Sequence, residues 1–411
     1  MKRIIRIFKR IFVCVLLLFA CVVNVGAQGS DKGGLSFDER LDSMDVYLLT
    51  CQPHDEIYSL YGHTSIRVVD RLTQRDFAVN FGVFDSTAKF FALRFVFGLT
   101  DYMMAVNSFD RFLDEYRYYG SGVYQQHINL SRQEKADFFM ALQENAEPEN
   151  VVYRYNFLYN NCTTKARDIL LGAVKGRINY TTTSLQQGKR SFRDLVHYKT
   201  ANHRWAAFGN DILLGVAADY NMNHDTRQFL PEVLMNDFDS AKVIMANGGE
   251  KVLVDSAKWV LLPGTPYEAN GGTEFPLSPR MMAILFFCAI LSLCLVQLLM
   301  LKKRLLWLNY LLVLLYALPG IILGAMVFSK HPTVNVNLQI LIFNPLYLLI
   351  LVPRQYMKWR WDAILLFVVL FFIGNAIQSY AEGMNIMALA LLMIVLTNIT
   401  FERYSHLVGK K

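Results

Sequence analysis

The chain has 411 residues, of which 54% are hydrophobic, and it carries a formal net charge of +7. This hydrophobic share is too high for an ordinary soluble protein and indicates membrane-spanning segments. The basic residues gather near the N-terminus and beside apolar C-terminal segments, so the charge does not predict a nucleic acid as a partner. No cofactor and no metal are expected, because the histidines of the central segment lack metal-ligand spacing.

The N-terminus is typical of a cleavable signal peptide. Basic residues within the first ten positions precede an uncharged run over 11–25, and Val25-Gly26-Ala27 is a small-residue cleavage pattern. We therefore predict that residues 1–27 are removed and that residues 28–277 form an exported domain. Two alternatives stay open: Leu18-Phe19-Ala20-Cys21 loosely resembles a lipobox, and an uncleaved run would serve as an anchor.

The exported segment shows both strand and helix patterns, which predicts an α+β domain. Alternating apolar residues indicate strands over 45–50, 65–70 and 77–83, the last two forming a hairpin, and glycine-rich turns delimit a further hairpin over 251–262. Ser131 and Glu134 have the spacing of a capping box, which opens a helix. A second helix is predicted over 162–171.

Cys162 stands where this second helix begins, directly after the capping residues Asn160 and Asn161. A thiol in the first helical turn faces unpaired backbone N–H groups and the positive end of the helix dipole, so its thiolate form is favoured. His63, at the start of a predicted strand, is the expected base. Together they predict a catalytic Cys/His pair.

Further residues are expected to complete this site. Asn80 lies on the return strand of the hairpin that starts near His63, so we expect it to orient the imidazole, with Asp70 and Glu56 as weaker alternatives. The backbone N–H groups of Cys162 and the first helical turn are the expected oxyanion donors, joined by Tyr61 or Asn161.

A structural interpretation competes with the catalytic one. After signal removal, Cys51 and Cys162 are the cysteines that remain in the exported domain. Two cysteines in an oxidising compartment can form a structural disulfide, which needs neither a helix start nor a histidine. That alternative stays open on the sequence alone.

The C-terminal region, 278–411, is predicted to be a transmembrane domain. Uncharged stretches of near 20 residues, about the length that crosses a bilayer, run over 281–301, 305–329, 333–352, 363–380 and 383–400. Basic residues flank the ends of the first, third and fifth stretches, and this asymmetry places those ends in the cytoplasm. We therefore predict a five-helix, multi-pass protein of the inner membrane, with the C-terminus cytoplasmic and residues 28–277 in the periplasm.

Two segments are candidates for lipid contact. His331, Asn335, Asn337 and Asn344 cluster at the outer entry of the third stretch, where they either hold a phospholipid head group or cap and pack a helix kinked at a proline. Arg94 lies in a segment over 90–104 that is rich in aromatic residues and methionine. That segment is either core or an apolar surface for an acyl chain.

Short motifs follow one another along the chain: Thr50-Cys51-Gln52-Pro53, Tyr61-Gly62-His63-Thr64, Asn80-Phe81-Gly82-Val83-Phe84, Tyr155-Asn156-Phe157 and Asn160-Asn161-Cys162-Thr163-Thr164. In this order, followed by a five-span tail, they resemble the Bacteroides-type Lnb family of lipoprotein N-acyltransferases. The His-before-Cys order also resembles circularly permuted papain-like hydrolases and the lecithin:retinol acyltransferase group.

The resemblance implies a thiol acyltransferase. Such an enzyme takes an acyl chain from a membrane phospholipid, holds it as a cysteine thioester, and passes it to the α-amino group of the diacylglyceryl cysteine of a lipoprotein. It also implies a permuted papain-like fold for the exported domain. Two other classes remain open: a membrane-anchored Cys/His peptidase or amidase, and a non-enzymatic envelope protein.

Overall fold

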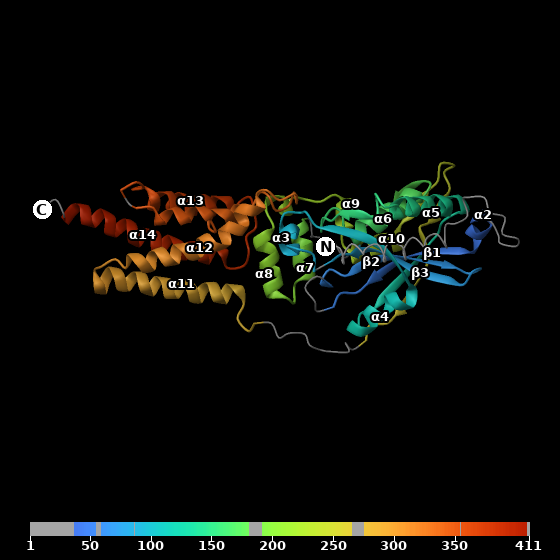
Figure 1. The fold of residues 1–411 in the computed structure, drawn as a ribbon, viewed down its shortest axis with the longest axis horizontal. Coiled ribbons are helices and arrows are strands. Elements are labelled where there is room, and N and C mark those ends of the chain that lie inside the picture. The colour runs from blue at the N-terminus through green and yellow to red at the C-terminus, as the bar shows by residue number, and fades with distance from the viewer. Residues whose placement is uncertain are drawn as a thin grey trace. The chain divides into compact units, whose positions relative to one another are not determined.

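The computed structural model describes residues 37–54, 59–85, 87–180, 191–264, 275–353 and 355–408. The chain divides into two compact units whose segments alternate along the sequence (Figure 1). Unit 1 comprises Met1–Phe91, Leu99–Gly188 and Asn223–Gly271, and unit 2 comprises Ala92–Gly98, Lys189–Met222 and Gly272–Lys411. The predicted signal peptide, 1–27, lies outside the described residues.

Unit 1 is built on an antiparallel sheet with the strand order β10-β5-β1-β2-β3-β4-β6. The strands are β1 (Met44–Cys51), β2 (His63–Asp70), β3 (Arg75–Val83), β4 (Asp101–Ser108), β5 (Val123–Ile128), β6 (Val152–Arg154) and β10 (Val254–Leu261). The hairpin expected over 65–83 is confirmed as β2 and β3.

Helices cover both faces of this sheet (Figure 1). The period-two alternation of β1 sends Leu48 toward one core and Leu49 toward another. Helices α5 (Arg132–Ala146), α6 (Cys162–Ala173) and α10 (Pro231–Ser240) pack on the first core, and α4 (Phe109–Tyr119) packs on the second. The capping box predicted at Ser131 opens α5, and α6 begins at Cys162 as expected. The short helices of unit 1 are α2 (Phe37–Arg40), η1 (Leu41–Ser43) and α9 (His224–Arg227).

A second, small sheet corrects the hairpin expected over 251–262. Strand β9 (Glu250–Val252) pairs with β8 (Lys242–Ile244), which pairs with β7 (Arg177–Asn179), whereas β10 pairs with β5 in the large sheet. Leu253, fully buried between β9 and β10, is the point where the chain passes from one sheet to the other. The sequence pattern thus predicted the strands β9 and β10 correctly, but the prediction that they pair with each other was wrong.

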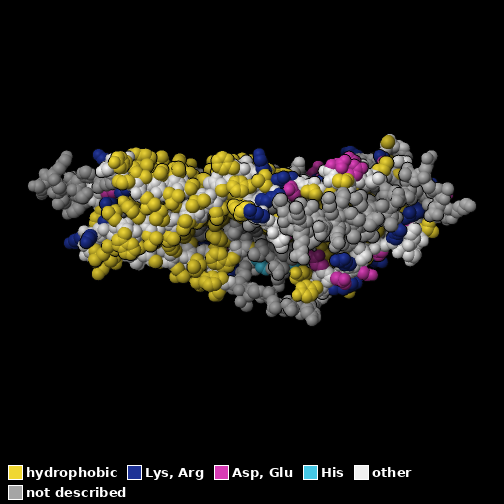
Figure 2. Space-filling view, viewed as in Figure 1, with side chains coloured by type: hydrophobic (Ala, Val, Ile, Leu, Met, Phe, Trp, Pro, Cys, Tyr) yellow, Lys and Arg dark blue, Asp and Glu magenta, His cyan; other side chains and the backbone are white. Residues whose placement is uncertain are grey.

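Unit 2 is helical, and hydrophobic side chains cover its C-terminal helices (Figure 2). Three helical stretches of the described residues are long and apolar enough to cross a membrane: Pro279–Leu301, Leu306–Met326 and Met384–Arg403. They correspond to α11 (Pro279–Leu295) with the π-helix η5 (Val296–Leu301), to α12 (Leu306–Met326), and to part of α14 (Met384–Val408). The other helices are α7 (Phe192–Lys199), α8 (Arg204–Leu213), η4 (Val216–Asp219), η6 (Leu338–Leu341), η7 (Pro345–Leu351), α13 (Arg360–Gly374) and α3 (Phe91–Val96), whose first residue, Phe91, still belongs to unit 1.

The third and fourth stretches do not form the long α-helices expected from the sequence. The third consists of two 3₁₀ helices, η6 and η7, and each begins after an asparagine whose side chain accepts a backbone N–H: Asn337 caps Gln339, and Asn344 caps Leu346. These caps, with Pro345, end any continuous α-helix. The fourth, α13, has 15 residues, so it spans roughly 22 Å, less than the hydrocarbon core of a bilayer.

Candidate active site

Cys162 is the first residue of α6, and its position is fixed by an asparagine cap. The Asn161 side chain accepts hydrogen bonds from the N–H groups of Thr163 and Thr164, both at 3.0 Å. Its amide nitrogen donates to two carbonyls, Phe157 O at 3.0 Å and Phe229 O at 2.9 Å. Asn161 therefore holds the start of α6, and with it the thiol, against two loops. Both hydrogens of the Asn161 side-chain amide are engaged in these two hydrogen bonds. Asn161 therefore supports the site structurally and does not donate to an oxyanion.

His63 is the first residue of β2 and is held by Asn80 of the neighbouring strand β3. The His63 Nε2 atom lies 3.0 Å from Asn80 Oδ1, and Gly82 N–H donates to the same oxygen at 2.7 Å. The register of β3 and β4 shifts between Asn80 and Val83, and this bulge turns the Gly82 N–H toward the Asn80 side chain. The structure thus brings His63 and Asn80 together as the hairpin predicted.

These contacts also fix the tautomer of the imidazole. A backbone N–H can only donate, so the Asn80 atom that faces Gly82 is the carbonyl oxygen. That oxygen can only accept, so His63 Nε2 carries a hydrogen. The other ring nitrogen, Nδ1, then holds the lone pair in the neutral form. It is the nitrogen left to take a proton, and the imidazole lies near enough to Cys162 for each group to shift the pKa of the other.

The electrostatics of the pair favour an ionised thiol. Burial raises the pKa of Cys162, but the charge and hydrogen bond of His63, with hydrogen bonds from the Thr64 N–H and the Thr163 hydroxyl, lower this pKa to about 7. Burial lowers the pKa of His63, yet the adjacent Cys162 thiolate reverses the effect and raises it. These shifts favour the thiolate of Cys162 and the imidazolium of His63, the charge states that nucleophilic catalysis by a thiol requires.

The oxyanion donors expected in the first helical turn are only partly available. The N–H groups of Thr163 and Thr164 are taken by the Asn161 cap. The Cys162 N–H is not bound by this cap, so it is the first-turn amide that can donate a hydrogen bond to an oxyanion. Tyr61 lies in the loop before β2, one residue before Gly62. Gly62 has a φ of +77°, and a Cβ at this position would lie 2.8 Å from Cys51 O, so a side chain there would be strained.

Cys51 and Cys162 are both free thiols in the structure. Cys51 is buried, and its strand position pairs with His63 across β1 and β2. Burial raises its pKa far above the usual range, so it stays a neutral thiol while Cys162 ionises. The surroundings of the two cysteines, both in unit 1, thus shift their thiol pKa values in opposite directions: upward for Cys51 and downward for Cys162.

Two family models match the chain. The model of the Lnb N-terminal periplasmic domain matches residues 38–198, and the model of the Lnb transmembrane domain matches residues 270–405. The chain belongs to the Lnb family. No curated protein and no solved structure matches it. This Lnb-type protein is therefore a membrane protein with a periplasmic N-terminal domain, which confirms the resemblance found in the sequence.

The amino-acid sequence indicated the aromatic segment over 90–104 of this Lnb-type protein, but it did not show that Tyr102 in this segment meets Tyr155 and Phe84. Tyr102 on β4 stacks on Tyr155 with ring centroids 3.9 Å apart, and Phe84 also stacks on Tyr102, with ring centroids 4.7 Å apart. Burial raises the pKa of Tyr102 and Tyr155, and the negative charge of the Cys162 thiolate raises both further. The motifs around Phe84 and Tyr155 contain these rings, but only the pairing of β4 with β6 shows that they meet.

The polar residues of the membrane tail have structural partners within unit 2. His331 Nε2 lies 3.1 Å from Phe95 O, and Asn337 donates to Ile212 O at 2.7 Å while capping η6. Asn344 caps η7, Asn335 is partly buried in the loop before η6, and Arg94 is partly buried on α3. These contacts favour the interpretation of the asparagine and histidine cluster as capping and packing residues over that of a head-group site.

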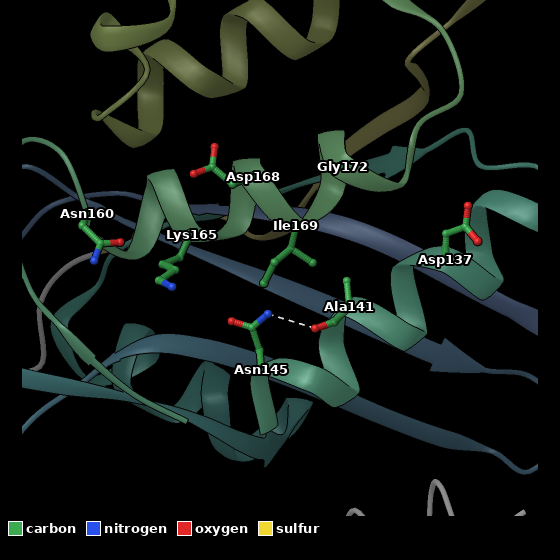
Figure 3. Close-up of a pocket in the computed structure, with 8 residues that line it drawn as sticks. All are labelled: Asp137, Ala141, Asn145, Asn160, Lys165, Asp168, Ile169 and Gly172. Atoms are coloured by element: carbon green, nitrogen blue, oxygen red, sulfur yellow. Dashed lines mark hydrogen bonds between the residues drawn. The ribbon is translucent and has the colours of Figure 1, made fainter. Parts of the chain in front are cut away.

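A surface cavity of about 340 Å³ lies between α5 and α6 and does not include the thiol (Figure 3). Charged and amide side chains line it, among them Asp137, Lys165 and Asp168, so it does not suit an acyl chain. Within the described ranges, no three or more His, Cys, Asp or Glu side chains gather closely enough to hold a metal ion. Among the described residues, Cys162 and its neighbours therefore remain the candidate active site of this Lnb-type protein.

Proposed function

We propose that this protein is a lipoprotein N-acyltransferase of the inner membrane. It takes an acyl chain from a membrane phospholipid and transfers it, through a thioester on Cys162, to the α-amino group of the diacylglyceryl cysteine of a lipoprotein. The observation that carries the proposal is the helix-start thiol paired with an imidazole whose tautomer is fixed by Asn80. Family membership and the membrane-spanning helices support a lipid as the acyl donor.

The first half-reaction forms the acyl-enzyme. His63 Nδ1 takes the proton of Cys162, and the thiolate attacks the ester carbonyl carbon of a phospholipid. The Cys162 N–H stabilises the resulting oxyanion. When the C–O bond breaks, the imidazolium returns its proton to the leaving alkoxide, so a lysophospholipid departs and a thioester remains.

The second half-reaction consumes the thioester. The neutral α-amino group of the acceptor attacks the thioester carbonyl, and His63 Nδ1 takes the proton that the nitrogen loses as the amide forms. The C–S bond then breaks, and Cys162 leaves as a thiolate paired with the imidazolium, the state in which the cycle began. A thioester suits this step because amines attack it more readily than the oxygen ester from which it came.

The membrane arrangement belongs to the same proposal. The catalytic domain lies in the periplasm, and the tail crosses the inner membrane so that the C-terminus is cytoplasmic. Basic residues next to the spans support this orientation through the positive-inside rule: Lys302, Lys303, Arg304, Lys358, Arg360 and Arg403. The order of a strand histidine before a helix-start cysteine supports a permuted papain-like arrangement of the catalytic domain.

Lipoprotein mass spectrometry tests the proposal in a host whose lipoprotein N-acylation depends on this protein. Cys162→Ser and Cys162→Ala should leave lipoproteins diacylated, while the variant protein is present in the membrane at the normal level. Cys51→Ser is the matched control, because its thiol is buried and outside the proposed chemistry; it should keep triacylation. Full triacylation with Cys162→Ala would refute the proposed nucleophile.

A further inference from the structure

Beside the proposed nucleophile, four aromatic side chains of unit 1 form one continuous stack. The ring centroids of Phe91 and Phe84 lie 5.4 Å apart, those of Phe84 and Tyr102 4.7 Å, and those of Tyr102 and Tyr155 3.9 Å. The successive rings are inclined by 17°, 22° and 12°, so each ring is stacked on the next. We call these four residues the aromatic stack.

The Tyr155 end of the stack is tied to Cys162 by a short closed loop. Asn156 and Asn160 exchange two backbone hydrogen bonds, of 3.0 and 2.9 Å, which bring the two ends of the loop together. Tyr155 precedes this bridge, and Asn161 with Cys162 follows it. Tyr102, Tyr155 and Cys162 also pack against the same buried core, and the Cys162 thiolate is near enough to both rings for its charge to raise the pKa of each tyrosine.

The four rings are partly buried, and each keeps some of its surface exposed. None of the four side chains carries a charge, whereas the cavity between α5 and α6 is lined by Asp137, Lys165 and Asp168 among others. A row of aromatic rings that lies near a nucleophile and has no charged member is suited to an extended hydrocarbon chain.

We infer that the aromatic stack binds the acyl chain of the Cys162 thioester and sets its preferred length, with the rings rather than the tyrosine hydroxyls making the contact. This inference rests on the proposed acyl transfer and names the surface that the acyl group occupies during it. The acyl carbonyl stays at Cys162, and the chain runs along Tyr155, Tyr102 and Phe84 toward Phe91. Longer chains contact more rings and are bound more tightly.

The test uses the full-length protein in vesicles of phosphatidylcholine with saturated chains of defined length, from short to long. The acyl adduct on Cys162 is measured by intact-mass analysis. Phe84→Ala should lower adduct formation with long chains by about tenfold relative to short chains, the effect expected when an apolar contact of about two methylene groups is lost. Tyr102→Phe, which keeps the ring, should retain the chain-length profile of the natural protein.

Two controls make the result specific. Alkylation of Cys162 by iodoacetamide at neutral pH shows that the thiol site of each variant is intact. Tyr118→Ala removes an exposed aromatic ring of unit 1 that is outside the stack, and it should not alter the profile. Equal loss for all chain lengths in Phe84→Ala, or an unchanged profile, overturns the inference.

Other outcomes overturn it in different ways. If Tyr102→Phe abolishes the adduct as fully as Tyr102→Ala does, the hydroxyl is the functional group and the proposed ring contact is wrong. If the natural protein forms no adduct with any chain length, the proposed function fails and the inference fails with it. An adduct that forms normally but ignores chain length overturns the inference alone.

Discussion

The His63 imidazole occupies the space that a side chain at Gly82 would need. A Cβ at position 82 would lie 2.8 Å from His63 Cε1 and 3.2 Å from Asn80 Oδ1, both too close for ordinary contact. The bulge in β3 that places Gly82 here also supplies the N–H that holds Asn80. One glycine therefore makes room for the base and orients the group that holds it.

Gly82→Ala should consequently impair acyl transfer without loss of the thiol. The new methyl group displaces the imidazole, and a misplacement of about 1 Å costs roughly 100-fold in rate. Transfer to a lipoprotein acceptor is the measurement. Gly172→Ala, on the same helix as Cys162, meets nothing within 4 Å and should leave the rate unchanged. Equal rates for the two variants would show that the position of His63 is not constrained by Gly82.

The pH dependence of Cys162 reactivity follows from its lowered pKa. Because the thiolate is the reactive form, alkylation by iodoacetamide should fall as pH drops below about 7 and reach a plateau above it. His63→Gln removes the cationic partner, so the midpoint should move upward by about 1 to 3 pH units. Peptide mapping separates Cys162 from the other cysteines. A midpoint near 8.5, about that of a free cysteine, in the natural protein contradicts the ion pair.

Two variants of Asn80 test whether this residue orients His63 or has a merely structural role. Asn80→Asp keeps an oxygen that accepts from both His63 Nε2 and Gly82 N–H, and its charge raises the pKa of the imidazole further, so the basic limb of the pH–rate profile should move to higher pH. Asn80→Ala removes the acceptor and should lower the rate by about tenfold or more. If both variants lose activity equally and neither moves the profile, Asn80 does not act through His63.

Loss of the Asn161 side chain should lower the stability of the protein more than loss of the neighbouring Asn160 side chain. Asn161→Ala removes a helix cap, worth about 1 kcal/mol, and leaves the carbonyls of Phe157 and Phe229 without this donor, at about 1 to 3 kcal/mol. Thermal unfolding of the full-length protein in detergent measures the loss. Asn160→Ala removes one exposed bond to Arg154 O and should change the melting temperature less. The reverse order would contradict the assigned cap.

Local rules predicted much of this site. The asparagine pair before Cys162 indicated the helix start, and the hairpin placed Asn80 opposite the strand that begins at His63. Both inferences use residues close in sequence. The bulge at Gly82 was not predicted. An extra residue near the end of β3 leaves the apolar alternation of the residues before it unchanged, so the sequence pattern does not reveal it.

Long-range and competing contacts account for the rest. The meeting of Tyr102 with Tyr155 depends on the pairing of β4 with β6, which no local pattern reveals. Two of the first-turn amides expected at the oxyanion, those of Thr163 and Thr164, are instead bound by the Asn161 side chain. In the membrane tail, hydropathy counted 333–352 as one helix because Asn337 and Asn344, which cap two separate 3₁₀ helices, lie within an apolar run.

The thioester on Cys162 is the central claim, and intact-mass analysis of the full-length protein incubated with phospholipid vesicles tests it most directly. The account predicts an added acyl mass that maps to Cys162, that hydroxylamine removes, and that disappears when a diacylated lipoprotein peptide is supplied as acceptor. Cys51→Ser should still form this adduct, and Cys162→Ala should not. An acyl mass that persists in Cys162→Ala, or a protein that transfers acyl chains without ever carrying one, would contradict the account.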